Sequence, residues 1–148
     1  GVVAAAVGIP GLGEWYDAVR GAGARLGGAA IRVSHVPDLA GSLFCFESPG
    51  WFSCNRLDGC FAELCAATAL QRGICDAYGH MLVATGRAEL VVEPQLKVWD
   101  VAATSLVVTE AGGCFSDLAG SPSIRSGHAV VSNGLVHDAA LALIARHR

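Results

Sequence analysis

Residues 93–113 read EPQLKVWDVAATSLVVTEAGG, and this stretch decides how the rest of the chain is interpreted. The apolar run over 98–111, followed by Gly112 and Gly113, predicts a helix that ends at the glycines. Asp100 falls in the first turn of that helix, where free N–H groups and the helix dipole stabilise a negative charge. Since the same place suits a phosphate with its metal ion, Asp100 is interpreted either as a helix cap or as a metal ligand.

Strand and helix patterns alternate on both sides of this helix. Strands are expected over 42–46, 73–75, 88–92, 114–117 and 128–132, and further helices around 61–68, over 76–85 and around 136–143. Such alternation is typical of an α/β fold in which helices cover a sheet. Short strands separated by Gly and Pro predict an antiparallel meander near the start of the chain. We therefore divide the chain into an antiparallel sheet region over 1–36 and an α/β layer over 37–148.

Composition excludes several classes of protein. Of the 148 residues, 53% are hydrophobic and 16% are charged, which is typical of a folded chain and not of a disordered one. The longest apolar run, over residues 1–9, is too short to cross a bilayer, so no membrane partner is expected. The net charge is −3 and no basic stripe is present, so no nucleic-acid partner is expected.

The cysteines show neither a Cys-x-x-Cys pair nor the spacing of a zinc module; they are Cys45, Cys54, Cys60, Cys65, Cys75 and Cys114. Several lie in apolar settings, so we expect reduced, buried thiols that act as small hydrophobic side chains. Reduced thiols indicate a cytoplasmic protein.

Residues 93–113 also carry a family resemblance. Residues 99–103 and 110–113 resemble the second signature of the inositol monophosphatase family, which are Mg²⁺-dependent, lithium-sensitive phosphomonoesterases with a layered αβαβα fold. Further blocks along nearly the whole chain are similar to that family, at 21–24, 33–34, 82–88 and 132–134. The resemblance implies the same layered fold, and it implies that Asp100 is a ligand of Mg²⁺.

Within the family, the chain looks most like the histidinol-phosphate phosphatase branch. The residues that carry this likeness are 48–52, 72–73, 76–78, 93–95, 133–135 and 137–138. The resemblance implies that Asp76 and Glu93 line the pocket for the alcohol portion of the substrate, where two carboxylates suit an amine and an imidazole. The alternative interpretation of Asp76 is a helix cap, and that of Glu93 is a solvated strand end. Cys75 stands where the branch usually has Gly.

The chain also lacks motifs that the family carries. The family's first half has a Glu-bearing segment and an Asp-Pro-x-Asp-Gly-Thr motif, which supply most metal ligands and the group that activates water; neither occurs here. Residues 55–60 echo the second motif faintly, and we interpret them as a turn in which Asp58 caps the next helix. Two-metal hydrolysis needs several carboxylates, so Asp100 alone would hold at best one mostly hydrated ion.

The resemblance therefore implies the C-terminal, substrate-binding part of a Mg²⁺-dependent phosphomonoesterase that acts on histidinol phosphate or inositol monophosphate. The remaining half would belong to the same polypeptide or to a second chain. We expect the 148-residue chain alone to be inactive and to associate as a homo-oligomer. The alternative is a non-catalytic remnant that binds a phosphorylated ligand or a partner protein.

Overall fold

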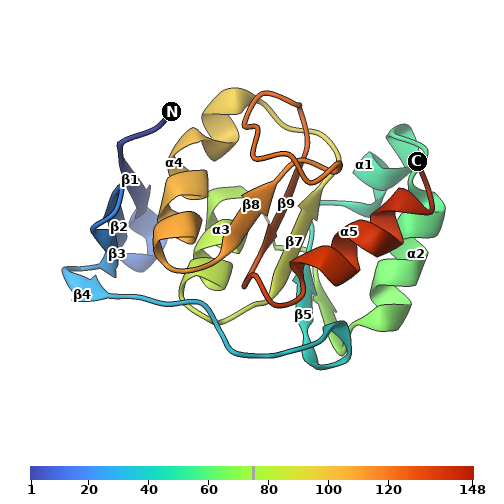
Figure 1. Ribbon diagram of the computed structural model, residues 1–148, viewed down its shortest axis with the longest axis horizontal. Helices are drawn as coiled ribbons and strands as arrows, with labels where there is room; N and C mark the ends of the chain where they lie inside the picture. The colour runs from blue at the N-terminus through green and yellow to red at the C-terminus, as the bar shows by residue number, and fades with distance from the viewer. Residues whose placement is uncertain (75) are drawn as a thin grey trace.

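The computed structural model describes residues 1–74 and 76–148. Its elements form layers in the order sheet, helices, sheet, helices, which Figure 1 shows from left to right. The predicted α/β class and the layered arrangement are confirmed.

The first sheet is an antiparallel meander, as predicted, with the strand order β1-β2-β3-β4. Its strands are β1 (Ala4–Ile9), β2 (Glu14–Val19), β3 (Gly23–Leu26) and β4 (Ala29–Ala30), with a 3-10 turn η1 (Pro10–Leu12) between the first two. Alternate side chains face opposite sides of a strand. Tyr16 and Ala18 accordingly pack into the core, whereas Trp15 and Val19 on the same strand are exposed.

The second sheet has the order β6-β5-β7-β9-β8, in which β6, β5 and β7 are parallel and the other pairs are antiparallel. Its strands are β5 (Leu43–Cys45), β6 (Leu70–Arg72), β7 (Leu90–Glu93), β8 (Cys114–Ser116) and β9 (Ala129–Ser132). The helices are α1 (Pro49–Cys54), α2 (Asp58–Ala67), α3 (Asp76–Ala84), α4 (Val98–Glu110) and α5 (His137–Ala145), with a second 3-10 turn η2 (Leu39–Gly41). Figure 1 shows α3 and α4 between the two sheets, and α1, α2 and α5 beyond the second.

The central strands β5, β7 and β9 of the second sheet are largely buried on both faces, and this explains their apolar sequences. In β7, Val91 packs into the core shared with the first sheet, α3 and α4. Its neighbours Leu90 and Val92 point the other way, into the core shared with α1, α2 and α5. Because both faces of these strands are covered, their sequences do not alternate between polar and apolar residues, which is the usual sequence signal of a strand.

Two local predictions were wrong. The strand expected over 73–75 lies earlier, at Leu70–Arg72; Gly73 and Ile74 belong to no strand, and Cys75 lies outside the described residues. The strand is a short edge strand with Leu70 exposed, so it lacks the apolar pattern of a buried one. Asp58 does not cap a helix from outside but is the first residue of α2, where its carboxylate accepts a hydrogen bond from the Ser53 hydroxyl.

The cysteine prediction is confirmed in part. Five cysteines in the described part of the chain are free thiols, of which Cys45 and Cys60 are fully buried. Burial raises the pKa of each of these two thiols to about 11, so they stay protonated and inert. Cys54, in contrast, is exposed.

No helix among residues 1–74 and 76–148 is long and apolar enough to cross a membrane. The longest, α4, has 13 residues, where a bilayer needs roughly 20.

Candidate functional site

The predicted site residues meet at one edge of the second sheet. Strands β6, β5 and β7 are parallel neighbours, so their carboxyl ends lie side by side at that edge. Asp76 follows β6 in the chain, Glu93 ends β7, and Asp100 lies in the first turn of α4 just beyond. All three line one pocket of about 230 Å³, together with Glu47, Trp51, Gln95, Leu96 and Lys97. The carboxyl ends of parallel strands are where open α/β sheets commonly bind ligands.

Glu93 is the innermost acid of this pocket. It is only 6% exposed, so the interpretation as a solvated strand end is wrong. Its Oε2 lies 2.9 Å from Nε2 of His80, which is itself buried on α3. A carboxylate buried at this depth needs hydrogen-bond partners to offset the loss of water, and the imidazole is one of them.

Asp100 is exposed, and it both accepts a capping hydrogen bond and lines the pocket. Its Oδ2 accepts the backbone N–H of Lys97 at 2.7 Å, which confirms the capping interpretation. No hydrogen bond joins its Oδ1 to another residue of the described ranges, and Asp100 lines the pocket. One oxygen is thus used by the helix while the other remains available to a ligand.

Asp76 has a backbone φ of +55°, in the left-handed region that side chains seldom adopt. Asp tolerates this region better than most residues, at a cost of about 1–2 kcal/mol. Among residues 1–74 and 76–148, no backbone N–H bonds to its carboxylate as a cap would require. The strained backbone and the exposed carboxylate therefore coincide at the pocket, which is where such strain often accompanies function.

Sequence reasoning missed the other pocket residues. Glu47 lies two residues after the end of strand β5 and adds a fourth carboxylate. Its position after a strand, next to the residues 48–52 that resemble the phosphatase branch, was the signal that could have found it. Lys97 is the one cation among the described lining residues, so the pocket is negative overall and favours a cationic ligand or a metal ion.

The metal chemistry available here is limited. No group of three or more His, Cys, Asp or Glu side chains in the described ranges is close enough to hold a metal ion. Mg²⁺ usually keeps several water molecules and binds through one or two carboxylates plus substrate phosphate. The Asp100 carboxylate could serve as one such ligand of Mg²⁺.

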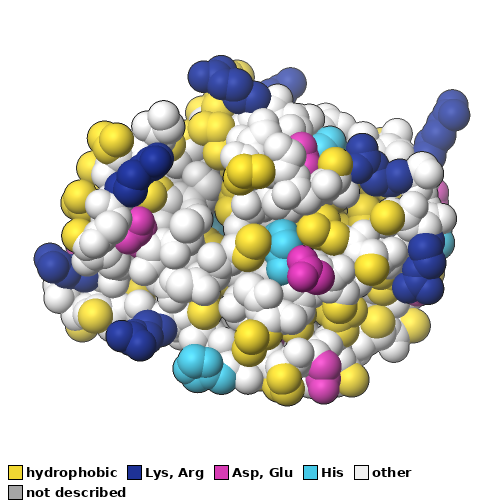
Figure 2. Space-filling view, in the orientation of Figure 1, with side chains coloured by type: hydrophobic (Ala, Val, Ile, Leu, Met, Phe, Trp, Pro, Cys, Tyr) yellow, Lys and Arg dark blue, Asp and Glu magenta, His cyan; other side chains and the backbone are white. Residues whose placement is uncertain are grey.

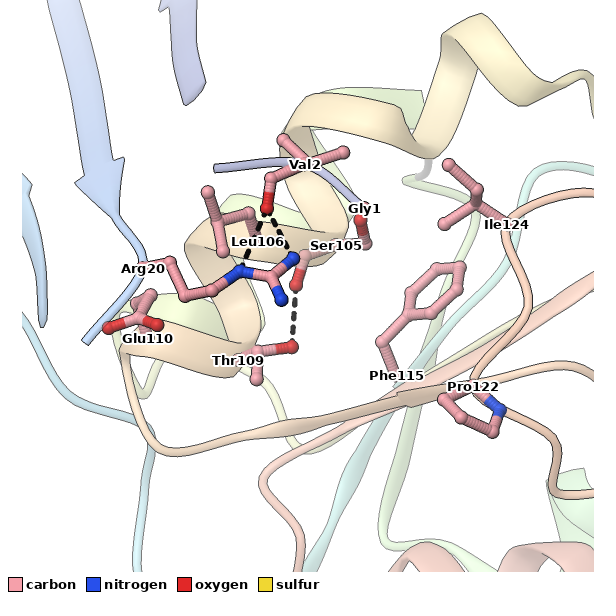
Figure 3. A pocket seen from close by; sticks show the side chains of 10 residues that line it. All are labelled: Gly1, Val2, Arg20, Ser105, Leu106, Thr109, Glu110, Phe115, Pro122 and Ile124. Carbon is pink, nitrogen blue, oxygen red and sulfur yellow. Dashed lines mark hydrogen bonds between the residues drawn. The ribbon is translucent and has the colours of Figure 1, made fainter. Parts of the chain in front are cut away.

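A larger cavity of about 320 Å³ lies along the second half of α4, and Figure 3 shows its lining. Its polar groups are occupied within the protein: the Arg20 guanidinium donates to the Val2 carbonyl, and the Thr109 hydroxyl donates to the Ser105 carbonyl. The remaining lining is mostly apolar, and none of the predicted site residues belongs to it. The chemistry therefore points to the smaller, carboxylate-lined pocket.

Comparison with known proteins agrees with this fold. A sequence model of the inositol monophosphatase family matches residues 1–148. The chain belongs to the inositol monophosphatase family. It is 40% identical to a histidinol-phosphatase of Streptomyces coelicolor over 138 residues, which cover 89% of this chain and 52% of that protein. It is 36% identical to the Nus factor SuhB of Pseudomonas aeruginosa, over 90% of this chain and 52% of that protein.

Solved structures of the family share the fold. An IMPase from Thermotoga maritima superposes with a TM-score of 0.83 at 28% identity, covering 95% of this chain and 55% of that one. The inositol monophosphate-bound SaIMPase-II superposes with a TM-score of 0.89 at 26% identity, covering 98% and 57%. The chain thus spans about half the length of the relatives it matches. The predicted family and the likeness to histidinol-phosphatases are confirmed.

Proposed function

We propose that this chain is the substrate-binding part of a Mg²⁺-dependent phosphomonoesterase whose preferred substrate is histidinol phosphate. The observation that carries the proposal is the pocket at the ends of β5, β6 and β7, where four carboxylates face one cation. Such a pocket attracts the cationic amine of histidinol, whereas inositol offers only neutral hydroxyl groups. Membership of a phosphatase family and the identity to histidinol-phosphatases support the same choice.

The pocket residues would contact different parts of the substrate or the metal ion. Glu93, deep in the pocket, would accept a hydrogen bond from the ammonium group or the imidazole N–H of the substrate. Asp76, at the start of α3, would interact with the same cationic end of the substrate. Lys97 would meet the phosphate from the rim of the same pocket. Asp100 would hold Mg²⁺ through the oxygen that the helix does not use. When bound, the ion supplies positive charge to the phosphate and lowers the pKa of a bound water.

The remaining metal ligands would come from another segment of the same polypeptide or from a second chain. The proposal is supported by the described ranges, in which no group of three or more His, Cys, Asp or Glu side chains could hold a metal ion, whereas two-metal hydrolysis needs several carboxylates. The same observation favours the second candidate, a non-catalytic protein that binds a phosphorylated ligand or a partner. In either case we infer a cytoplasmic protein that forms a homo-oligomer.

A phosphatase assay tests the proposal on the native protein that contains this chain. Phosphate release is measured from histidinol phosphate, inositol monophosphate and an uncharged alkyl phosphate, with Mg²⁺ and with a chelator. We expect turnover that requires Mg²⁺ and is fastest with histidinol phosphate, and no turnover by the isolated 148-residue chain. Absence of turnover by the native protein, together with specific binding of a phosphorylated ligand, would favour the non-catalytic candidate.

A further inference from the structure

We propose that His80 is a positioning residue, which holds the Glu93 carboxylate in the pocket and is itself held by Thr104. The proposal rests on the proposed function, because it assigns Glu93 to the cationic end of the substrate. It adds a residue that lies behind the pocket and touches no ligand, and it makes that residue a determinant of substrate selectivity.

The three side chains form a buried chain of hydrogen bonds across two layers of the fold. His80 on α3 is 1% exposed and Thr104 on α4 is 2% exposed. The Thr104 hydroxyl lies 2.8 Å from Nδ1 of His80, and Nε2 on the other side of the ring lies 2.9 Å from Oε2 of Glu93. The helices α3 and α4 thus fix the last residue of β7 from behind.

The position of the proton on His80 follows from its neighbours. An ionised carboxylate only accepts hydrogen bonds, so an imidazole lone pair 2.9 Å from it would be repelled. With Glu93 ionised, Nε2 carries a proton and donates a hydrogen bond to the carboxylate. The hydroxyl of Thr104 either donates to Nδ1 of a neutral ring, or accepts from the charged ring while it donates to the Val101 carbonyl at 3.4 Å. Both arrangements leave the same donor pointing at Glu93.

This donor gives Glu93 a fixed orientation at the pocket. A glutamate side chain has three rotatable bonds, and its freedom must be lost when it binds a ligand. The buried imidazole removes part of that freedom before the substrate arrives, so binding costs less. The gain applies to a substrate that uses the carboxylate and not to one that lacks a cationic end. If His80 were only a buried core residue, its loss would affect all substrates alike.

Two substitutions of His80 separate positioning from packing. His80→Gln places an amide nitrogen near the Nε2 position and keeps a donor for Glu93, whereas His80→Asn reaches only the Nδ1 position and keeps a partner for Thr104. In the native protein, we expect His80→Asn to raise KM for histidinol phosphate about tenfold, with kcat nearly unchanged. Its KM for inositol monophosphate should stay within about twofold, and His80→Gln should recover most of the selectivity for histidinol phosphate.

Thr104 offers a matched pair of its own. Thr104→Val has the same shape without the hydroxyl, and Thr104→Ser keeps the hydroxyl. We expect the Val variant to raise KM for histidinol phosphate about threefold and the Ser variant to leave it within about twofold. Far-UV circular dichroism and the melting temperature of each variant verify that it is folded.

Imidazole ¹⁵N NMR provides a readout that does not depend on activity. We expect a protonated Nε2 on His80 in the wild-type protein. A ring protonated at Nδ1 alone would overturn the proposal, and so would an equal rise in KM for both substrates in folded His80→Asn. If Glu93→Gln itself affected both substrates equally, the proposed function would fail instead, while the hydrogen bond from His80 would stand on the NMR result.

Discussion

The two ends of α4 carry one acid each, and the two acids are used differently. At the C-terminal end, Glu110 accepts the backbone N–H groups of Gly21 at 2.8 Å and Gly23 at 2.9 Å. At the N-terminal end, Asp100 accepts one N–H, that of Lys97, with a single oxygen. Both acids belong to the sequence blocks that resemble the family signature, yet only one of them faces the carboxylate-lined pocket.

The difference shows that the two sequence blocks contain both a residue bonded within the fold and a residue that lines the pocket. Glu110 uses both carboxylate oxygens to fasten the turn between β2 and β3 to the helix. Those bonds, first from Gly21 and then from Gly23, lower the pKa of Glu110. Asp100 has an oxygen to spare at the pocket. The two acids therefore differ in how many carboxylate oxygens accept hydrogen bonds from the fold: two for Glu110 and one for Asp100.

The largest expected effect is at the N-terminal end. Asp100→Asn retains an acceptor for the Lys97 N–H but removes the charge that would hold the ion. In the native protein, we expect kcat to fall about 100-fold and the Mg²⁺ concentration for half-maximal activity to rise, with a stability change below about 1 kcal/mol.

Glu110→Gln is the matched control, because it removes one charge from the opposite end of the same helix. It should leave kcat and the Mg²⁺ requirement unchanged. If Asp100→Asn had as little effect on activity as this control, Asp100 would be a helix cap alone.

A substitution just after the C-terminal end of α4 should change the stability of the fold. Gly113 follows α4, and a Cβ there would lie 2.6 Å from the Ser132 carbonyl oxygen and 2.8 Å from a Val108 methyl group. Because both neighbours are in the packed interior, we expect Gly113→Ala to lower the free energy of unfolding by about 1–3 kcal/mol, measured by urea denaturation. Gly11→Ala meets nothing within 4 Å and should change stability by less than about 0.5 kcal/mol. Equal stability of the two variants would contradict the close contacts around Gly113.

A smaller, pH-dependent effect is expected for Glu110→Gln. The pKa of Glu110 in the folded protein is lowered from its ordinary value of 4.5, so the carboxylate stabilises the fold above that value. This contribution is lost as the pH falls through the lowered pKa. The variant should therefore melt below the wild-type protein at pH 7, and the difference should shrink at pH values under 4.5. A difference in melting temperature that stayed constant with pH would contradict the two hydrogen bonds.

Much of the fold could be predicted from local sequence patterns. The helix α4 ends just before Gly112 and Gly113, as predicted. Gly112 adopts the left-handed backbone conformation that commonly ends a helix, so this signal is local in the sequence. The buried strand β7 and the last helix also lie close to their expected positions. The strand β6 was misplaced, since an edge strand of three residues carries too little periodicity to fix its position.

The site could be predicted only in part, for a different reason. Asp76, Glu93 and Asp100 were found by resemblance, and the structure brings them to one pocket. Glu47 was missed because its place beside them depends on which strands are neighbours, and local patterns do not determine strand order. The hydrogen bond between His80 and Glu93 was missed for the same reason, since it joins two separate elements.

The central claim is that the pocket at the end of β7 selects a cationic substrate through Glu93. The most direct test is the ratio of kcat/KM for histidinol phosphate to kcat/KM for inositol monophosphate, measured for the native protein and for its Glu93→Gln variant. We predict that the substitution lowers this ratio about tenfold or more, mainly through KM for histidinol phosphate, because only that substrate loses an ion pair. An unchanged ratio, with both substrates affected equally, would contradict the claim and leave only membership of the family.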